Sequence, residues 1–135
     1  FQGARVILGQ QKNDWQIDLL AMQPIDRRLY EPDKAREGLW FLGVIGDWRR
    51  WSEIITLQPY YLGLEQNADP SDGNPSRNRS IHSAALRGYG ILGTSGFDYD
   101  FDIVYQRGKE GAQAHRALGF TAELGRSFDH RWKPR

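Results

Sequence analysis

The sequence of 135 residues contains no cysteine, which excludes disulfide frameworks, thiolate metal sites and cysteine nucleophiles. It also has almost no net charge, because 18 basic residues are balanced by 17 acidic ones. Such a balance leaves no strong field to attract nucleic acid, so we expect no nucleic-acid partner. Long apolar runs are missing too: the longest one, residues 38–46, is half of the roughly 18 residues that a transmembrane helix needs. The sequence therefore predicts no membrane-spanning helix.

What the chain does contain is glycine and aromatic residues. There are 15 Gly, 5 Trp, 6 Tyr and 6 Phe, whereas hydrophobic residues make up only 39% of the chain. A helical bundle fits this composition poorly, and a β protein fits it better. The length allows one domain at most, which we expect to span residues 1–135.

Alternation with a period of two predicts the strands. Seven runs show it, at residues 4–10, 15–23, 39–45, 53–64, 81–92, 97–106 and 114–128. In the clearest run, residues 97–106, the apolar side chains occupy one face and the aspartates the other: Phe97, Tyr99, Phe101, Ile103 and Tyr105 against Asp98, Asp100 and Asp102. The run at 39–45 is apolar on both faces, which predicts a fully buried strand. Pro59 lies within a run and predicts a local bulge or a gap in pairing.

The connections between these runs alternate in length. Short breaks lie near residues 11–14, 46–50, 94–95 and 129–133, and longer ones at 24–38, 65–80 and 107–113. Short and long connections then lie at opposite ends of the sheet, and aromatic residues gather near both ends. This predicts an all-β, antiparallel up-and-down meander of about seven strands, part of a larger transmembrane β-barrel. The alternative is a soluble up-and-down β-barrel that binds a small apolar ligand in its interior.

One hairpin allows a prediction of register. If residues 94–95 form a two-residue loop, Tyr89 lies opposite Asp100 and Arg87 lies opposite Asp102, all on the polar face. A charge pair of Arg87 with Asp102 could position a hydrophilic solute in a pore. It could equally be an ordinary cross-strand ion pair that holds the register.

Catalytic and cofactor motifs are weak. Gly88, Gly90 and Gly93 fit the GxGxxG spacing, but an alternating strand follows where a dinucleotide site needs a helix. The wall formed by Asp98, Asp100 and Asp102 makes a carboxylate-based hydrolase the last of the alternatives. No histidine has a partner at metal-ligand spacing. We therefore expect no catalytic residue, no metal and no cofactor.

Several segments resemble the alginate export family of outer-membrane proteins of Gram-negative bacteria. They are FQGARVILG at 1–9, TLQPYYLGLEQ at 56–66, GFDYDFDIVYQRG at 96–108 and ALGFTAELGRSFDHRWKPR at 117–135. The resemblance implies a barrel of about eighteen strands that passes an anionic polysaccharide or another hydrophilic solute. Its partners would be membrane lipid, the solute and the remaining strands of the barrel. Because the chain begins at Phe1 without a basic and then apolar leader, we expect an internal piece of a longer protein.

Strand parity predicts which residues face the lumen and contact the solute. They are Arg5, Asp18, Arg87, Tyr89, Asp98, Asp100, Asp102 and Glu123. The resemblance implies that arginines line a channel for alginate, and Arg5 and Arg87 are the positions that could play this part. The five acidic residues make the wall net acidic, which favours a porin-like channel of unidentified solute over one for alginate itself.

Overall fold

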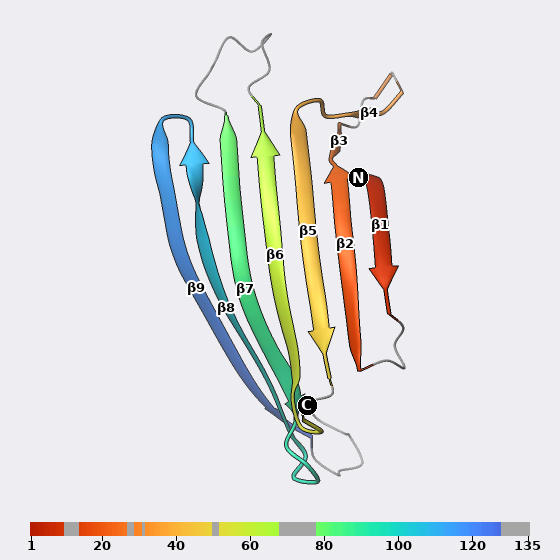
Figure 1. Cartoon of the computed structure of the whole chain (residues 1–135), viewed down its shortest axis with the longest axis vertical. Coiled ribbons are helices and arrows are strands. Elements are labelled where there is room, and N and C mark those ends of the chain that lie inside the picture. The colour runs from red at the N-terminus through yellow and green to blue at the C-terminus, as the bar shows by residue number, and fades with distance from the viewer. Residues whose placement is uncertain (10–13, 27–28, 31, 50–51, 68–77, 128–135) are drawn as a thin grey trace.

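The computed structural model of the chain describes residues 1–9, 14–26, 29–30, 32–49, 52–67 and 78–127. Seven strands in these ranges form one antiparallel sheet in the order β1-β2-β5-β6-β7-β8-β9 (Figure 1). Their bounds are Gln2–Leu8 for β1, Trp15–Gln23 for β2, Leu39–Trp48 for β5, Thr56–Gln66 for β6, Arg79–Ile91 for β7, Phe97–Glu110 for β8 and Gln113–Arg126 for β9. This confirms the predicted all-β meander of seven strands, and the sheet is consistent with part of a larger barrel.

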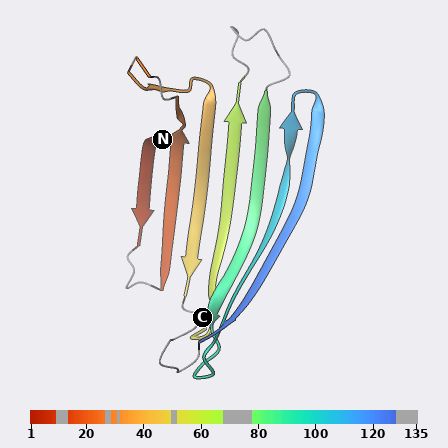
Figure 2. The same cartoon turned by 180° about the vertical axis from the view of Figure 1, so that it is seen from behind.

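The sheet is a single curved layer. In Figures 1 and 2, β7, β8 and β9 bend and run at an angle to β1 and β2. Each strand pairs with its neighbour in the meander, so within the described residues β1 and β9 are the two edges of the sheet. A short second hairpin, formed by β3 (Ile25–Asp26) and β4 (Lys34–Ala35), lies in the connection between β2 and β5. No helix in the described part of the chain is long and apolar enough to cross a membrane.

The two faces of the sheet differ in chemistry. One face, which we call the polar face, carries Asp18, Arg87 and Asp102. The middle of the opposite face carries a continuous set of apolar side chains, which we call the apolar belt. It consists of Val6, Leu8, Ile17, Leu19, Trp40, Leu42, Val44, Leu57, Pro59, Tyr61, Ala84, Leu86, Phe101, Ile103, Tyr105, Leu118, Phe120, Ala122 and Leu124.

Exposure follows the faces in the opposite sense to a soluble protein. On the inner strand β5, Trp40, Leu42 and Val44 of the apolar belt are each 44% exposed. On the polar face, in contrast, Asp18 and Ser83 are buried at 7% and 8% exposure. Soluble domains rarely expose a contiguous apolar surface of this extent. The belt therefore needs an apolar environment.

The prediction of a fully buried strand at residues 39–45 is wrong. Trp40, Leu42 and Val44 of β5 belong to the apolar belt and are exposed, whereas Leu39 is buried on the polar face. Leu20 and Leu62 of the neighbouring strands lie close to Gly43 on that same face. The strand is apolar on both faces because one of them contributes to the belt and the other to a small leucine cluster.

Two predicted connections are also wrong. The β8–β9 connection, predicted as a long loop at residues 107–113, is a tight turn around Gly111, because both strands continue beyond the apolar belt. The β7–β8 connection is longer than the two residues predicted: β7 ends at Ile91 and β8 begins at Phe97, and the amide of Leu92 donates to the carbonyl of Phe97 at 2.8 Å. Residue 10 of the first predicted run and residue 128 of the last lie outside the described residues.

The predicted pairing gap at Pro59 is confirmed. The register of β5 with β6 runs from Leu39↔Gln66 to Ile45↔Tyr60 and resumes only at Trp48↔Leu57. Proline has no amide proton to donate to the β5 side of the ladder. On its other side Pro59 keeps its register with Leu86 of β7.

Candidate functional site

All eight residues predicted to face a lumen lie on the polar face. The cross-strand registers place them there without exception: Arg5, Asp18, Arg87, Tyr89, Asp98, Asp100, Asp102 and Glu123. They come from β1, β2, β7, β8 and β9, and they fall into two groups at either side of the sheet. The first group surrounds Asp18, and the second surrounds Arg87.

Arg87 forms the centre of the second group. The predicted register is confirmed, with Arg87 opposite Asp102 and Tyr89 opposite Asp100. The ion pair, however, is formed with the diagonal neighbour Asp100: Arg87 Nε donates to its two oxygens at 2.9 and 3.0 Å, and Nη2 donates as well. The guanidinium carbon also lies 5.0 Å from the centre of the Tyr89 ring. The predicted charge pair of Arg87 with Asp102 is therefore wrong, because the long side chain leans along the strand toward Asp100.

Asp102 has another partner. The hydroxyl of Tyr60, on β6, donates to Asp102 Oδ2 at 2.7 Å, across the intervening strand β7. Tyr60 lies opposite Ala85 of β7, whose small side chain leaves room for the tyrosine to reach the diagonally placed Asp102. The bond thus connects the acidic strand β8 to the middle of the sheet.

The first group joins β1 to β2. Arg5 Nε donates to Asp18 Oδ2 at 3.1 Å, its Nη2 donates to the same oxygen, and Gln16 donates to Asp18 Oδ1 at 3.0 Å. Both oxygens of this buried carboxylate are therefore hydrogen-bonded. Arg5 itself remains more than half exposed, at 57% of its side chain. It can present the free side of its guanidinium to a solute.

Asp98 and Glu123 form the most acidic part of the polar face. Glu123 lies directly opposite Asp100 in the register, and Asp98 lies opposite Gly125. The carboxylate of Asp98 covers Gly125, and its Oδ1 has no hydrogen-bond partner within the described residues. With two arginines against five acids among the eight residues, this wall is net acidic.

Strand parity alone did not single out several hydrogen-bonding residues of the same face. Gln58 donates to Asp47 Oδ1 at 2.8 Å, Gln106 donates to the Ser83 hydroxyl at 3.0 Å, and His115 Nε2 lies 3.1 Å from Gln106 Oε1. Parity within each run places these side chains on the polar face. The contacts of Ser83, Gln106 and His115 follow the registers of β7, β8 and β9, and that of Gln58 with Asp47 follows the register of β5 with β6.

The glycines that fit a dinucleotide motif serve the hairpin instead. Gly88 lies beneath the Phe101 ring, and Gly90 lets the backbone approach the carbonyl of Ile54, where a β-carbon would clash. Gly93 has a positive φ of 56° in the β7–β8 loop. No helix follows them, and strand β8 begins at Phe97. Among the described residues, no group of three His, Asp or Glu side chains could hold a metal ion.

The polar face thus has the chemistry of a hydrated wall. Side-chain hydrogen bonds link β1 to β2, β6 to β8 and β7 to β8, while Arg5 and Arg87 stay partly exposed. Such groups can exchange hydrogen bonds with hydroxyls and carboxylates of a passing solute. They offer no nucleophile with an adjacent base.

A known family accounts for these features over the full length of the chain. The sequence model described as alginate export matches residues 1–135. No curated protein and no solved structure matches the chain. The family consists of membrane-associated exporters rather than enzymes, which confirms the prediction that the protein is not an enzyme. The chain belongs to the alginate export family.

Proposed function

We propose that the chain, as one domain over residues 1–135, forms part of the wall of an outer-membrane channel. The channel passes a hydrophilic polysaccharide or small solute, anionic solutes included. The observation that carries the proposal is the division of the sheet into a hydrogen-bonded polar face and an exposed apolar belt. A transmembrane β-barrel places its apolar side chains toward lipid and its polar ones toward the lumen.

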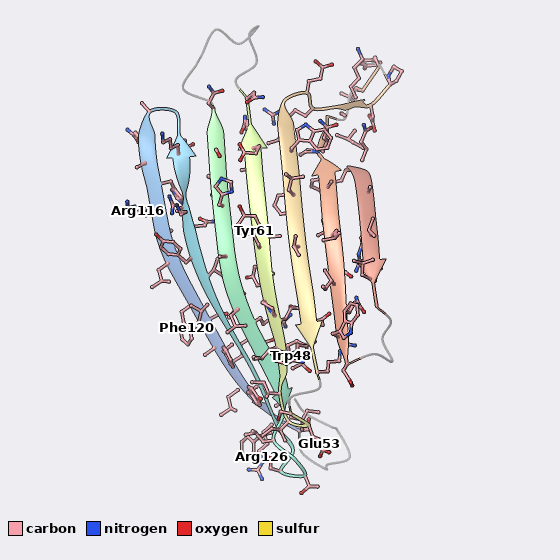
Figure 3. All side chains as sticks on the ribbon, viewed as in Figure 1. Trp48, Glu53, Tyr61, Arg116, Phe120 and Arg126 are labelled. Atoms are coloured by element: carbon pink, nitrogen blue, oxygen red, sulfur yellow. The ribbon has the colours of Figure 1, made fainter. Side chains whose placement is uncertain are left out.

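The height of the apolar belt supports this orientation. On β9 the belt runs between Arg116 and Arg126, with Phe120 between them (Figure 3). Ten residues of strand measure about 33 Å along the strand, and a tilt of about 40° reduces this to about 25 Å across a membrane. That is the height of the apolar band of outer-membrane barrels. Aromatic side chains of Trp15 and Trp48 lie at one end of the belt, and Trp40 lies at the other.

The charge of the polar face bears on the solute. A wall with more acids than arginines binds an anion weakly, which suits passage better than capture. The partially exposed Arg5 and Arg87 are the residues that we assign to contact with carboxylates or hydroxyls of the solute. The polar residues Asp18, Tyr89, Asp98, Asp100, Asp102 and Glu123 line the same lumen.

The soluble alternative requires the sheet to close on itself around an apolar interior. Within the described residues β1 and β9 pair only with β2 and β8, and the apolar belt is on the exposed face. We therefore assign the missing neighbours of β1 and β9 to further strands of a larger barrel. Those strands and the surrounding membrane lipid are the partners of this chain.

Spin labels at neighbouring positions of β8 test the proposal. Phe101 belongs to the apolar belt and Asp102 to the polar face, so a label at 101 should contact lipid and a label at 102 should contact water. Electron paramagnetic resonance of the full-length protein in bilayers measures this. Oxygen reports contact with lipid, and a water-soluble nickel complex reports contact with water. The reverse assignment would falsify the membrane channel.

The free edges of the sheet give a second prediction. Expressed alone without detergent, the chain should aggregate, because unpaired edge strands and an exposed apolar belt both recruit other chains. Size-exclusion chromatography with light scattering measures this directly. A monodisperse soluble monomer would favour the small ligand-binding barrel instead.

A further inference from the structure

A cluster of basic side chains lies beyond the apolar belt, on the same face of the sheet. We call His82, Arg107, Lys109 and Arg116 the basic cluster. The registers place His82 opposite Arg107 and Arg107 opposite Arg116, in one row across β7, β8 and β9. The next row toward the middle of the belt contains Tyr105 opposite Leu118. The basic cluster therefore begins where the apolar belt ends.

Two arginines directly opposite each other on one face repel, which is unfavourable unless an anion lies between them. The acidic residues nearby do not supply it. Glu65 lies 3.6 Å from His82, and Glu110 is on the polar face, where it pairs with Arg79 at 2.7 Å. Within the part of the chain that the structure describes, no ion pair reaches Arg107, Lys109 or Arg116.

The surface at the basic cluster is hollowed. A depression of about 490 Å³ is lined by all four residues of the cluster together with Ser80 and Tyr105. The guanidinium groups of Arg107 and Arg116 can each donate two hydrogen bonds to a phosphate. The adjoining belt offers apolar surface. A ligand with phosphates at one end and alkyl chains at the other matches both.

The opposite end of the belt is different. Arg126 of β9 lies there with its guanidinium 4.9 Å from the centre of the Phe97 ring, and Asp98 is the next residue of β8. Figure 3 shows Arg116 in the half of β9 near the β8–β9 turn and Arg126 at the opposite end. Among the described residues of β7, β8 and β9, this face therefore carries its basic cluster at the end where the β8–β9 turn lies.

We propose that the basic cluster binds the phosphate groups of a phosphorylated lipid headgroup in the membrane leaflet at this end of the barrel. The inference rests on the proposed function in one respect, since it takes the apolar belt to face lipid. It adds a specific lipid site outside the pore, in which Arg107 and Arg116 grip phosphate and Tyr105 and Leu118 contact the first segments of the alkyl chains. The lipid thereby removes the repulsion between the two arginines.

Binding of a fluorescent diphosphorylated lipid A to the full-length protein, in mixed micelles of a neutral detergent, tests the site. We expect the double variant R107Q/R116Q to bind at least tenfold more weakly, and a dephosphorylated analogue to bind the unaltered protein equally weakly. The matched control is R126Q, which removes one arginine at the other end of the same strand and should stay within about twofold of the unaltered protein.

A charge reversal separates loss of binding from loss of folding. Arg116→Glu places a carboxylate opposite Arg107, so it should fold at least as well without lipid while losing the phosphate site. Circular dichroism and heat-dependent gel mobility report the fold. The site is wrong if R107Q/R116Q or Arg116→Glu binds the phosphorylated lipid normally, or if inorganic phosphate at equal concentration displaces the lipid completely.

The proposed channel and the proposed lipid site are tested by different measurements. Conductance in planar bilayers depends on the polar face, so R107Q/R116Q should conduct as the unaltered protein does. A protein that conducts normally but shows no preference for phosphorylated lipid overturns the lipid site alone. A protein that binds the lipid but forms no pore overturns the channel alone.

Discussion

Phe120→Arg should destabilise the full-length protein in bilayers by about 2–4 kcal/mol, because it places a charge near the middle of the lipid-facing surface. Phe120 is exposed on the apolar belt, midway along β9, and no acidic side chain lies opposite it, since its register partner is Ile103. The free energy of unfolding, measured by reversible guanidinium or urea titration in vesicles, gives the magnitude.

The neighbouring residue supplies the matched control. Thr121 lies on the polar face, opposite Asp102, so Thr121→Arg should leave the free energy of unfolding within about 1 kcal/mol. The same charge is then tested at two adjacent positions that differ only in the face they occupy. Equal costs at both positions would contradict the assignment of the two faces, and a greater cost at Thr121 would reverse it.

The strands were predictable because alternation is a local property of the chain. The run at 15–23 coincides with β2, and Phe97 begins both the predicted and the observed strand. The β7–β8 register was predictable for a related reason: the loop is short, so opposite residues can be paired by counting. Even the wrong loop length left Arg87 opposite Asp102.

Interactions across long connections were not predictable. Tyr60 reaches Asp102 diagonally across β7, and this requires the alignment of β6 with β7, which are joined through residues 67–78. Polar composition at 107–113 likewise suggested a loop, although Arg107 and Lys109 are strand residues that pair beyond the apolar belt. Polar residues show only that the chain has passed beyond the apolar belt. A strand can continue past the belt, so polarity does not show where the strand ends.

The sequence also did not predict that Arg87 pairs with Asp100 rather than with Asp102. Register fixes which α-carbons are opposite, whereas the side chain selects between the direct neighbour and the diagonal one. Asp102, directly opposite, accepts the hydroxyl of Tyr60 at Oδ2, while Arg87 pairs with the diagonal Asp100. The side-chain partners of these residues therefore depend on β6, β7 and β8 together.

Arg87→Ala should shift the ion selectivity of the channel toward cations and reduce the flux of an anionic sugar more than that of a neutral one. The change removes the cation that pairs with Asp100, so the already acidic wall gains a net negative charge. A unit charge at about 4 Å contributes about 1 kcal/mol in water, which corresponds to a few-fold change in the permeability ratio. The reversal potential under a salt gradient measures it, and the effect should decrease at high salt.

The barrel should remain folded in this variant, because Arg87 and Asp100 are 41% and 30% exposed and such an ion pair adds little stability. Asp100→Asn is the reciprocal change, and it should shift selectivity toward anions by leaving the guanidinium unpaired. Opposite shifts in the two variants identify the pair as part of the conducting wall. If both variants keep the selectivity and conductance of the unaltered channel, Arg87 only holds the register of β7 with β8, and the selectivity of the pore is determined by other strands.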